Sequence, residues 1–172
     1  CATIDFLSDG RLLPAFGLGS AFSQDYSATG TLTKKRGKKA DEALKLVARL
    51  WAENDVSFEG EFYQYQGASI SPKPSNPNIP LWIGGSSELA MRRTAKYGTG
   101  WIGGIDTPEQ AKVVVTGVKS ALLKTGRTID NDHYGASLLF RFGCGDDPVV
   151  ASTAKGLAER VKQPTDRYMV AG

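Results

Sequence analysis

The chain has 172 residues, of which 41% are hydrophobic and 23% charged, with 20 glycines and 8 prolines, a globular composition that excludes collagen-like and disordered proteins. Its net charge of +3 is too small to indicate nucleic acid or an anionic membrane as the main partner. No apolar run reaches the roughly 18 residues of a membrane span and no secretory signal is visible at the start, so we expect a cytoplasmic protein.

The first predicted elements are a helix end and a strand. Residues 4–11 are typical of a helix closed by Gly10. The apolar run 12–18 predicts a buried strand, in which Pro14 lacks the N–H that a central strand position uses. The chain starts at Cys1 rather than at Met, which indicates a fragment or a processed piece.

The clearest helical pattern covers residues 38–53. Apolar residues recur there at spacings of three and four, with charged residues on the other side. The apolar set is Ala40, Ala43, Leu44, Val47, Leu50 and Trp51. Residues 56–70 then alternate aromatic and polar residues, which predicts a hairpin or an extended excursion. Four prolines within residues 71–80 predict a stiff, extended connection.

The tetrapeptide Trp-Ile-Gly-Gly occurs twice, at 82–85 and at 101–104. Each copy predicts the end of a strand followed by a capped helix. The first helix, 88–97, has Ser86 or Ser87 as its cap and ends at Gly98. The second has Asp106 or Thr107 as its cap, Pro108 at its first position and Gly126 as its stop.

A further strand is predicted at 137–142 and a further helix at 149–162. Strands that alternate with helices indicate parallel β/α units, with functional loops at the carboxyl ends of the strands. The four predicted strands are 12–18, 81–83, 101–103 and 137–142. A closed eight-stranded barrel usually needs about 250 residues, so this α/β chain is too short to be one.

The segment from Gly84 to Ser87 is a candidate phosphate site. Glycines let the backbone approach an anion, the first N–H groups of the helix point toward it, and the two hydroxyls can donate hydrogen bonds. A tight turn with a capping serine explains the same residues equally well. Gly17 and Gly19 do not complete a dinucleotide fingerprint, because Phe22 stands where the third glycine is required.

Three other features have plainer explanations. The basic run 34–39 could contact nucleic acid or an acidic cofactor tail, but solvated surface before a helix is the favoured interpretation. The aromatic residues Phe58, Phe62, Tyr63 and Tyr65 are expected to pack on a helix rather than to line a substrate mouth. His133, the single histidine, is expected on a surface loop, and Cys1 and Cys144 indicate neither a disulfide framework nor a zinc site.

The order of several motifs resembles the luciferase-like monooxygenase superfamily, in particular its deazaflavin (F420-type) oxidoreductase branch. The resemblance is dense over residues 2–103, and the family's usual Asp before Gly-Trp is replaced by Thr99. The matching stretches are 4–11, 16–19, Arg36-Gly37, Asp41-Glu42, Leu50-Trp51, 56–63, 72–74, 80–87, 92–98 and Gly100-Trp101.

The resemblance implies a (β/α)8 TIM-barrel type fold, here a partial barrel covering about the fourth to seventh strand units, with the excursion 56–80 inside one domain 1–172. It also implies that FMN or deazaflavin coenzyme F420 binds at the carboxyl ends of the strands. On that pattern Gly84, Gly85, Ser86 and Ser87 favour the cofactor phosphate, and Gly17 and Gly19 lie near the cofactor.

The implied activity is two-electron oxidoreductase chemistry on a small organic substrate. We assign no catalytic residue, because the family draws its polar catalytic groups from early strands that do not match this chain. The alternatives are a non-catalytic half-barrel that binds flavin or a protein, and an unrelated doubly wound α/β protein. Open strand edges lead us to expect a homo-oligomer or a missing barrel half as partner.

Overall fold

Four short parallel strands form the main sheet. The computed structural model describes residues 1–20, 24–137 and 147–161. Every neighbouring pair in the sheet is parallel, which confirms the predicted β/α alternation. The strands, in spatial order, are β1 (Ala15–Phe16), β4 (Trp82–Gly84), β5 (Gly100–Ile102) and β6 (Tyr134–Gly135).

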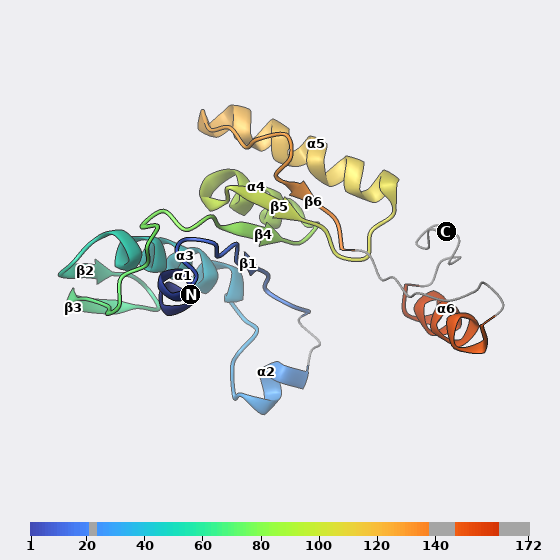
Figure 1. The fold of residues 1–172 in the computed structure, drawn as a ribbon, viewed down its shortest axis with the longest axis horizontal. Helices are drawn as coiled ribbons and strands as arrows, with labels where there is room; N and C mark the ends of the chain where they lie inside the picture. Colours follow the sequence, from blue (N-terminus) through green and yellow to red (C-terminus); the bar gives the residue numbers. More distant parts are fainter. Residues whose placement is uncertain (21–23, 138–146, 162–172) are drawn as a thin grey trace.

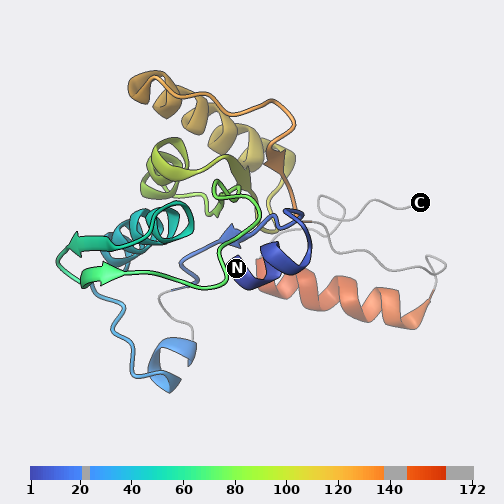
Figure 2. The same ribbon diagram turned by 60° about the vertical axis from the view of Figure 1, so that its left-hand side comes forward.

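Three helices cover one face of this sheet and lie side by side in Figures 1 and 2. The strand pairing explains why, because it places Phe16, Ile83, Trp101 and Tyr134 in one row across the four strands. Side chains alternate between the two faces of a sheet, so this row points toward the helices. The helices are α3 (Arg36–Ala52), α4 (Glu88–Tyr97) and α5 (Pro108–Thr125).

The core consists of two clusters that meet at the sheet. Leu44 of α3 packs with Ile83 and with the residues before β4 in the first cluster. In the second cluster, Val114 and Val118 of α5 pack on Trp101 of β5. The predicted apolar face of residues 38–53 is thereby confirmed, and Leu46, outside that set, is also buried.

The opposite face of the sheet carries Trp82. Its indole ring lies across the two neighbouring strands, since a Cβ atom on Gly100 would come within 2.5 Å of the ring and one on Gly135 within 2.8 Å. His133 packs against the same ring at a centroid distance of 5.6 Å. The pyrrole nitrogen of Trp82 is buried and has no hydrogen-bond partner among the described residues.

Helices α4 and α5 pack closely because of a glycine. A Cβ atom at Gly117 of α5 would lie 2.1 Å from the sulfur of Met91 on α4, so the thioether occupies the space that a side chain would need. Gly117 therefore forms a notch that seats Met91 and fixes the separation of the two helices.

The excursion between α3 and β4 begins with an antiparallel hairpin, β2 (Val56–Glu59) and β3 (Gln64–Ala68). Glu42 of α3 holds its turn by accepting hydrogen bonds from the backbone N–H groups of Glu61 at 3.0 Å and Phe62 at 2.9 Å. The predicted hairpin is therefore confirmed. The proline-rich connection 71–80 contains no helix or strand.

Several predicted boundaries change. β1 is shorter than 12–18, and Pro14 precedes it and accepts from the Trp82 N–H at 3.1 Å through its carbonyl. The strand beside β5 is β6, whereas the predicted strand 137–142 has Ser137 outside any strand and 138–142 outside the described residues.

Three further helices are α1 (Ala2–Leu7), α2 (Gln24–Ala28), which the sequence pattern missed, and α6 (Pro148–Val161). None of the described helices is long and apolar enough to cross a membrane.

The surface-loop prediction for His133 is confirmed only in part, because the residue lies outside any helix or strand but is not fully at the surface. The residue is half-buried just before β6, and its Nδ1 lies 2.9 Å from the carbonyl oxygen of Thr99. The N–H of Trp101 also donates to the His133 carbonyl at 2.9 Å. His133 thus helps to join β5 to β6.

Candidate functional site

A cleft of about 540 Å³ lies at the carboxyl ends of β1, β4 and β5. The carboxyl edge of a parallel sheet is where α/β proteins bind ligands, because the connecting loops diverge there. All six residues predicted near a cofactor line this one cleft, although they come from two loops: Gly17, Gly19, Gly84, Gly85, Ser86 and Ser87. The structure thus brings the two predicted groups together.

Gly85 shapes the turn after β4. Its φ of +116° is a backbone conformation that residues with side chains rarely adopt, and a Cβ atom there would lie 3.1 Å from the Cβ of Ala90. The indole N–H of Trp101 donates to the Gly85 carbonyl at 2.9 Å. A buried side chain of the neighbouring strand therefore holds this exposed turn in place.

Ser87 is the N-cap of α4. Its hydroxyl oxygen accepts from the Ala90 N–H at 3.2 Å, which leaves the hydroxyl proton available to a ligand. Ser86 is exposed at the same cleft. The first N–H groups of a helix have no acceptor within the helix, and its dipole favours negative charge at this end. The geometry thus suits an anion.

The loop after β1 forms the other side of the cleft. Gly19 has a φ of +63°, and no atom lies within 4 Å of the place where its Cβ would be. The hydroxyl of Tyr26 in α2 donates to the Leu18 carbonyl at 2.5 Å and anchors this loop. The open space around Gly19 leaves its backbone accessible from the cleft.

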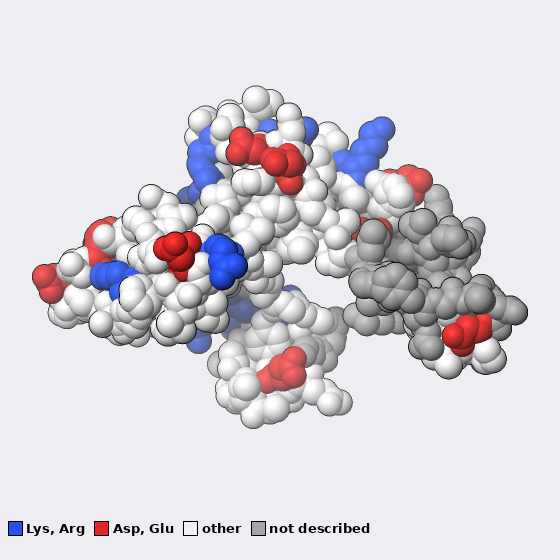
Figure 3. Space-filling model, in the orientation of Figure 1, with Lys and Arg blue, Asp and Glu red and all other residues white. Residues whose placement is uncertain are grey.

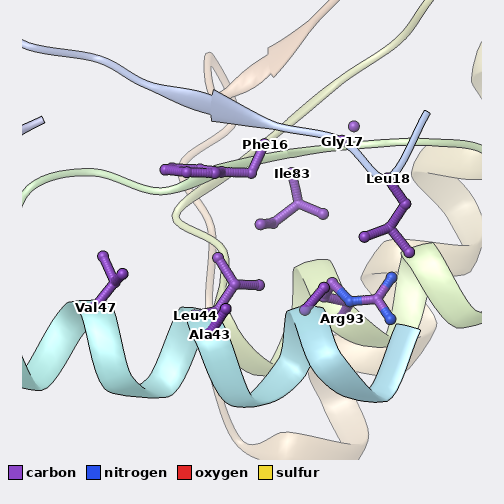
Figure 4. Close-up of a pocket in the computed structure, with 10 residues that line it drawn as sticks. Phe16, Gly17, Leu18, Ala43, Leu44, Val47, Ile83 and Arg93 are labelled. Atoms are coloured by element: carbon purple, nitrogen blue, oxygen red, sulfur yellow. The ribbon is translucent and has the colours of Figure 1, made fainter. Parts of the chain in front are cut away.

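Arg93 reaches the cleft from the second turn of α4. Only 8% of this residue is exposed. Its Nε donates to the Asp41 carboxylate of α3 at 2.5 Å, and its Nη2 donates to the Gly37 carbonyl at 3.3 Å. Figure 4 shows the guanidinium beside the N-terminal end of α3. The pair joins α3 to α4 directly behind the cleft.

A smaller apolar pocket of about 120 Å³ adjoins the cleft between the sheet and α3. Figure 4 shows Phe16, Leu18 and Ile83 above it and the aliphatic side chains of α3 below it. The two cavities share Phe16, Gly17, Leu18, Gly84 and Arg93. The cleft therefore has an apolar side as well as an anion-binding end.

Three charged residues that line the cleft were not predicted as part of the site, namely Arg36, Arg93 and Asp106. Arg36, from the basic run, lines the cleft and is half-buried, which corrects the solvated-surface interpretation at this position. Asp106 lines the cleft near the end of β5. No local motif marks Arg36 or Asp106 as a site residue. For Arg93 a signal exists, because the helical repeat places it on the same face as Ala90 and Tyr97 and so indicates a buried arginine.

Other candidate residues lie elsewhere. Neither His133 nor any of the four hairpin aromatics lines the cleft. The described residues contain no group of three or more His, Cys, Asp and Glu side chains that could hold a metal. Cys1 is a free, exposed thiol, and Cys144 lies outside the described residues. On the face drawn in Figure 3, basic and acidic side chains are interspersed.

Comparison with known proteins identifies the family of this chain. The sequence profile of the luciferase-like monooxygenase family matches residues 1–169. An uncharacterized protein of Mycobacterium tuberculosis is 34% identical over 115 residues, which are 65% of this chain and 39% of the relative. The F420-dependent glucose-6-phosphate dehydrogenase of Intrasporangium calvum is 30% identical over 135 residues, 75% of this chain and 40% of the relative. The chain spans about 40% of the length of these curated relatives.

Solved structures share the fold. An F420-dependent secondary alcohol dehydrogenase in complex with an F420-acetone adduct superposes with a TM-score of 0.72 and 23% identity, over 89% of this chain and 46% of that one. The oxygenating constituent of the Pseudomonas putida 3,6-diketocamphane monooxygenase, in complex with FMN, gives 0.67 and 16%, over 92% and 47%. From its α/β architecture and its match over residues 1–169, this chain belongs to the luciferase-like monooxygenase family.

Proposed function

We propose that this chain forms the phosphate-binding part of an oxidoreductase that uses FMN or deazaflavin coenzyme F420. The observation that carries the proposal is the convergence of two glycine loops and the α4 N-terminus on one cleft. Names of relatives support the choice of cofactor class, since they include F420-dependent enzymes and a structure in complex with FMN.

Each residue of the turn has a role in this proposal. Gly84 and Gly85 let the backbone approach the phosphate, and Ser86 and Ser87 donate from their hydroxyl groups. The dipole of α4 adds to the attraction. Gly17 and Gly19 leave room on the facing loop, and the apolar pocket beside Phe16 excludes water from that side.

The bound cofactor would supply the two-electron chemistry, by hydride transfer or by activation of oxygen. The residues described here bind and orient it, and we propose a small organic molecule as the substrate. Asp106 is the one carboxylate among the described residues that line the cleft, and no described histidine or cysteine joins it. We therefore assign no catalytic residue.

The test uses a charge change that preserves the helix cap. Asp and Asn both cap helices well, so Ser87→Asp and Ser87→Asn keep the α4 N-terminus while differing by one negative charge. Fluorescence titration with FMN and with coenzyme F420 measures affinity, and riboflavin serves as the ligand without phosphate. We expect Ser87→Asp to weaken FMN binding about tenfold to a hundredfold relative to Ser87→Asn and to leave riboflavin unaffected. Equal FMN affinities of the two variants would contradict the proposal.

A non-catalytic cofactor-binding module is the second candidate. The small number of titratable groups at the described cleft favours it, since proton transfer commonly uses a positioned His, Asp or Glu. Reoxidation of the reduced cofactor in the presence and absence of candidate substrates separates the two functions. Binding without turnover in any oligomeric state would favour the module.

A further inference from the structure

The N-terminus of α3 carries an unusual charge distribution. Four of the five residues from position 35 to 39 are basic, and the first turn contains no acidic residue. Cations at a helix N-terminus face the positive end of the helix dipole, which is unfavourable. Such an arrangement stabilises the protein only if negative charge comes from elsewhere, so each cation needs its partner identified.

Two of these cations reach the hairpin. Lys35 forms an ion pair with Glu61, and the hydrogen bond from Lys35 lowers the pKa of that carboxyl group. The ammonium of Lys39 lies 6.0 Å from the ring centroid of Tyr63. Lys38 is exposed to solvent on the same turn. None of these three residues lines the cleft.

Arg36 differs from these three residues because it lines the cleft. Its guanidinium carbon lies 5.8 Å from the ring centroid of Tyr26, the residue that anchors the Leu18 loop. Its Nη1 atom is buried and finds no hydrogen-bond partner within the described part of the chain. A buried, unpaired guanidinium nitrogen is costly, and a functional role is one of the recognised reasons for keeping such a group.

The neighbouring charges leave Arg36 uncompensated. Arg93 lies next to it in space, since its Nη2 donates to the Gly37 carbonyl, but Asp41 pairs with Arg93. Asp106 lines the same cleft and reduces the positive potential there. Arg36 is therefore the one basic residue at the cleft that forms no ion pair among the described residues, and the positive end of the α4 dipole lies at the same cleft.

We infer that Arg36 is a phosphate-binding residue, whose guanidinium donates to a phosphoryl oxygen of the ligand from the α3 side while the α4 N-terminus contacts the same group. This inference rests on the proposed function. It makes the site a clamp built from two helices rather than from one turn. Arg93 is then a positioning residue, held by Asp41, that fixes the start of α3 against α4.

The experiment compares Arg36→Met with Lys38→Met. Both variants remove one positive charge from the same helical turn and keep an aliphatic stem, but only the first removes a group from the cleft. We expect Arg36→Met to lose about tenfold or more in affinity for FMN and for coenzyme F420, with riboflavin affinity unchanged. Lys38→Met should stay within about twofold of the wild type for every ligand.

Thermal unfolding of the ligand-free protein gives a second readout. If Arg36 serves to bind a ligand, Arg36→Met removes a buried donor that is unpaired in the ligand-free protein. The variant should then unfold at the same Tm as the wild type or at a higher one. A lower Tm together with unchanged FMN affinity would assign Arg36 a structural role and overturn the inference. Should Arg36→Met not fold, Arg36→Lys replaces it, and wild-type FMN affinity in that variant also overturns the inference.

The two proposals fail in different ways. If the wild type binds FMN no better than riboflavin and F420 no better than its phosphate-free riboside, the proposed function is wrong. Thermal unfolding with inorganic phosphate then tests whether Arg36 binds an anion. A rise in Tm with phosphate that Arg36→Met loses and Lys38→Met keeps supports an anion site at Arg36, and an equal response in the variants overturns it.

Discussion

The two Trp-Ile-Gly-Gly segments have the same sequence and lie on adjacent strands, yet their tryptophans point to opposite faces of the sheet. Strand pairing aligns Ile83 with Trp101, so the second copy is offset by one residue. Because side chains alternate in a strand, this offset points Trp82 to the open face and Trp101 toward the helices. Trp101 is only 2% exposed, and its indole N–H supports the turn of the first copy.

The helix starts that follow differ in the same sense. Thr107 and Gln110 form a complete capping box at α5, with Pro108 in the first turn. At α4, Ser87 makes a single side-chain cap bond and the preceding turn is exposed. Both copies contribute residues to the cleft, but the second leads to a buried helix cap and the first to an exposed one. A repeated peptide does not by itself indicate a repeated function.

The largest expected effect tests the placement of Trp82. Gly100→Ala would put a Cβ atom 2.5 Å from the Trp82 ring, and we expect it to lower the free energy of unfolding by about 3 kcal/mol. Gly104→Ala is the control, since no atom lies within 4 Å of its Cβ position. Urea unfolding monitored by circular dichroism measures both. The double variant Gly100→Ala with Trp82→Leu should recover part of the loss, and no recovery would contradict the stacking.

The second prediction compares the two tryptophans directly. Trp101→Phe removes a buried hydrogen bond to Gly85 and leaves a cavity, which should cost about 2 kcal/mol. Trp82→Phe removes an indole nitrogen that has no partner among the described residues and should cost about 1 kcal/mol. Chemical unfolding of the two variants measures the difference. A larger loss for Trp82→Phe would reverse their assigned roles.

The third prediction concerns the turn after β4. Gly85→Ala forces a side chain into a φ of +116° and within 3.1 Å of Ala90, and we expect a loss of about 1–2 kcal/mol. FMN affinity should fall as well, since the turn is expected to rearrange. Gly104→Ala again provides the comparison at the corresponding position of the second copy. Equal stability of the two variants would show that the turns are not distinct.

The smallest expected effect is the difference in stability loss when the caps of α4 and α5 are removed. Ser87→Ala should cost about 0.5–1 kcal/mol and Thr107→Ala about 1–2 kcal/mol, because the second change breaks a capping box at a buried residue. Thermal unfolding of the two single variants measures the difference. The order would be reversed if the α4 start contributed more to the fold than to the cleft.

Much of this architecture could be predicted from the sequence because its signals are local. Glycines, caps and apolar spacing marked α3, α4, α5 and the turn at 84–87 correctly. The short strand β6 escaped detection because Tyr134 and Gly135 have no pattern of their own and form a strand only by pairing with β5. The polar helix α2 gave no amphipathic signal.

Arg36 and Arg93 were not predicted as site residues for the same reason, since their role depends on contacts between distant parts of the chain. Arg36 and Arg93 are separated by more than fifty residues, and the contact of Arg93 with Asp41 and Gly37 exists only after α3 packs on α4. Arginine in a charged run or on a short helix usually indicates exposed surface. Their burial at the cleft depends on tertiary packing, which a single sequence does not display.

The notch at Gly117 also makes the cleft sensitive to oxidants. Met91 fills that notch with its sulfur atom and belongs to the same helix that presents Ser87 and Arg93. Conversion to the sulfoxide adds a polar oxygen to a sulfur that already lies where a Cβ atom of residue 117 would be. Peroxide damage at this thioether would therefore displace α4 from α5, and a chemical event on the outer side of the helix would alter the site at its N-terminal end.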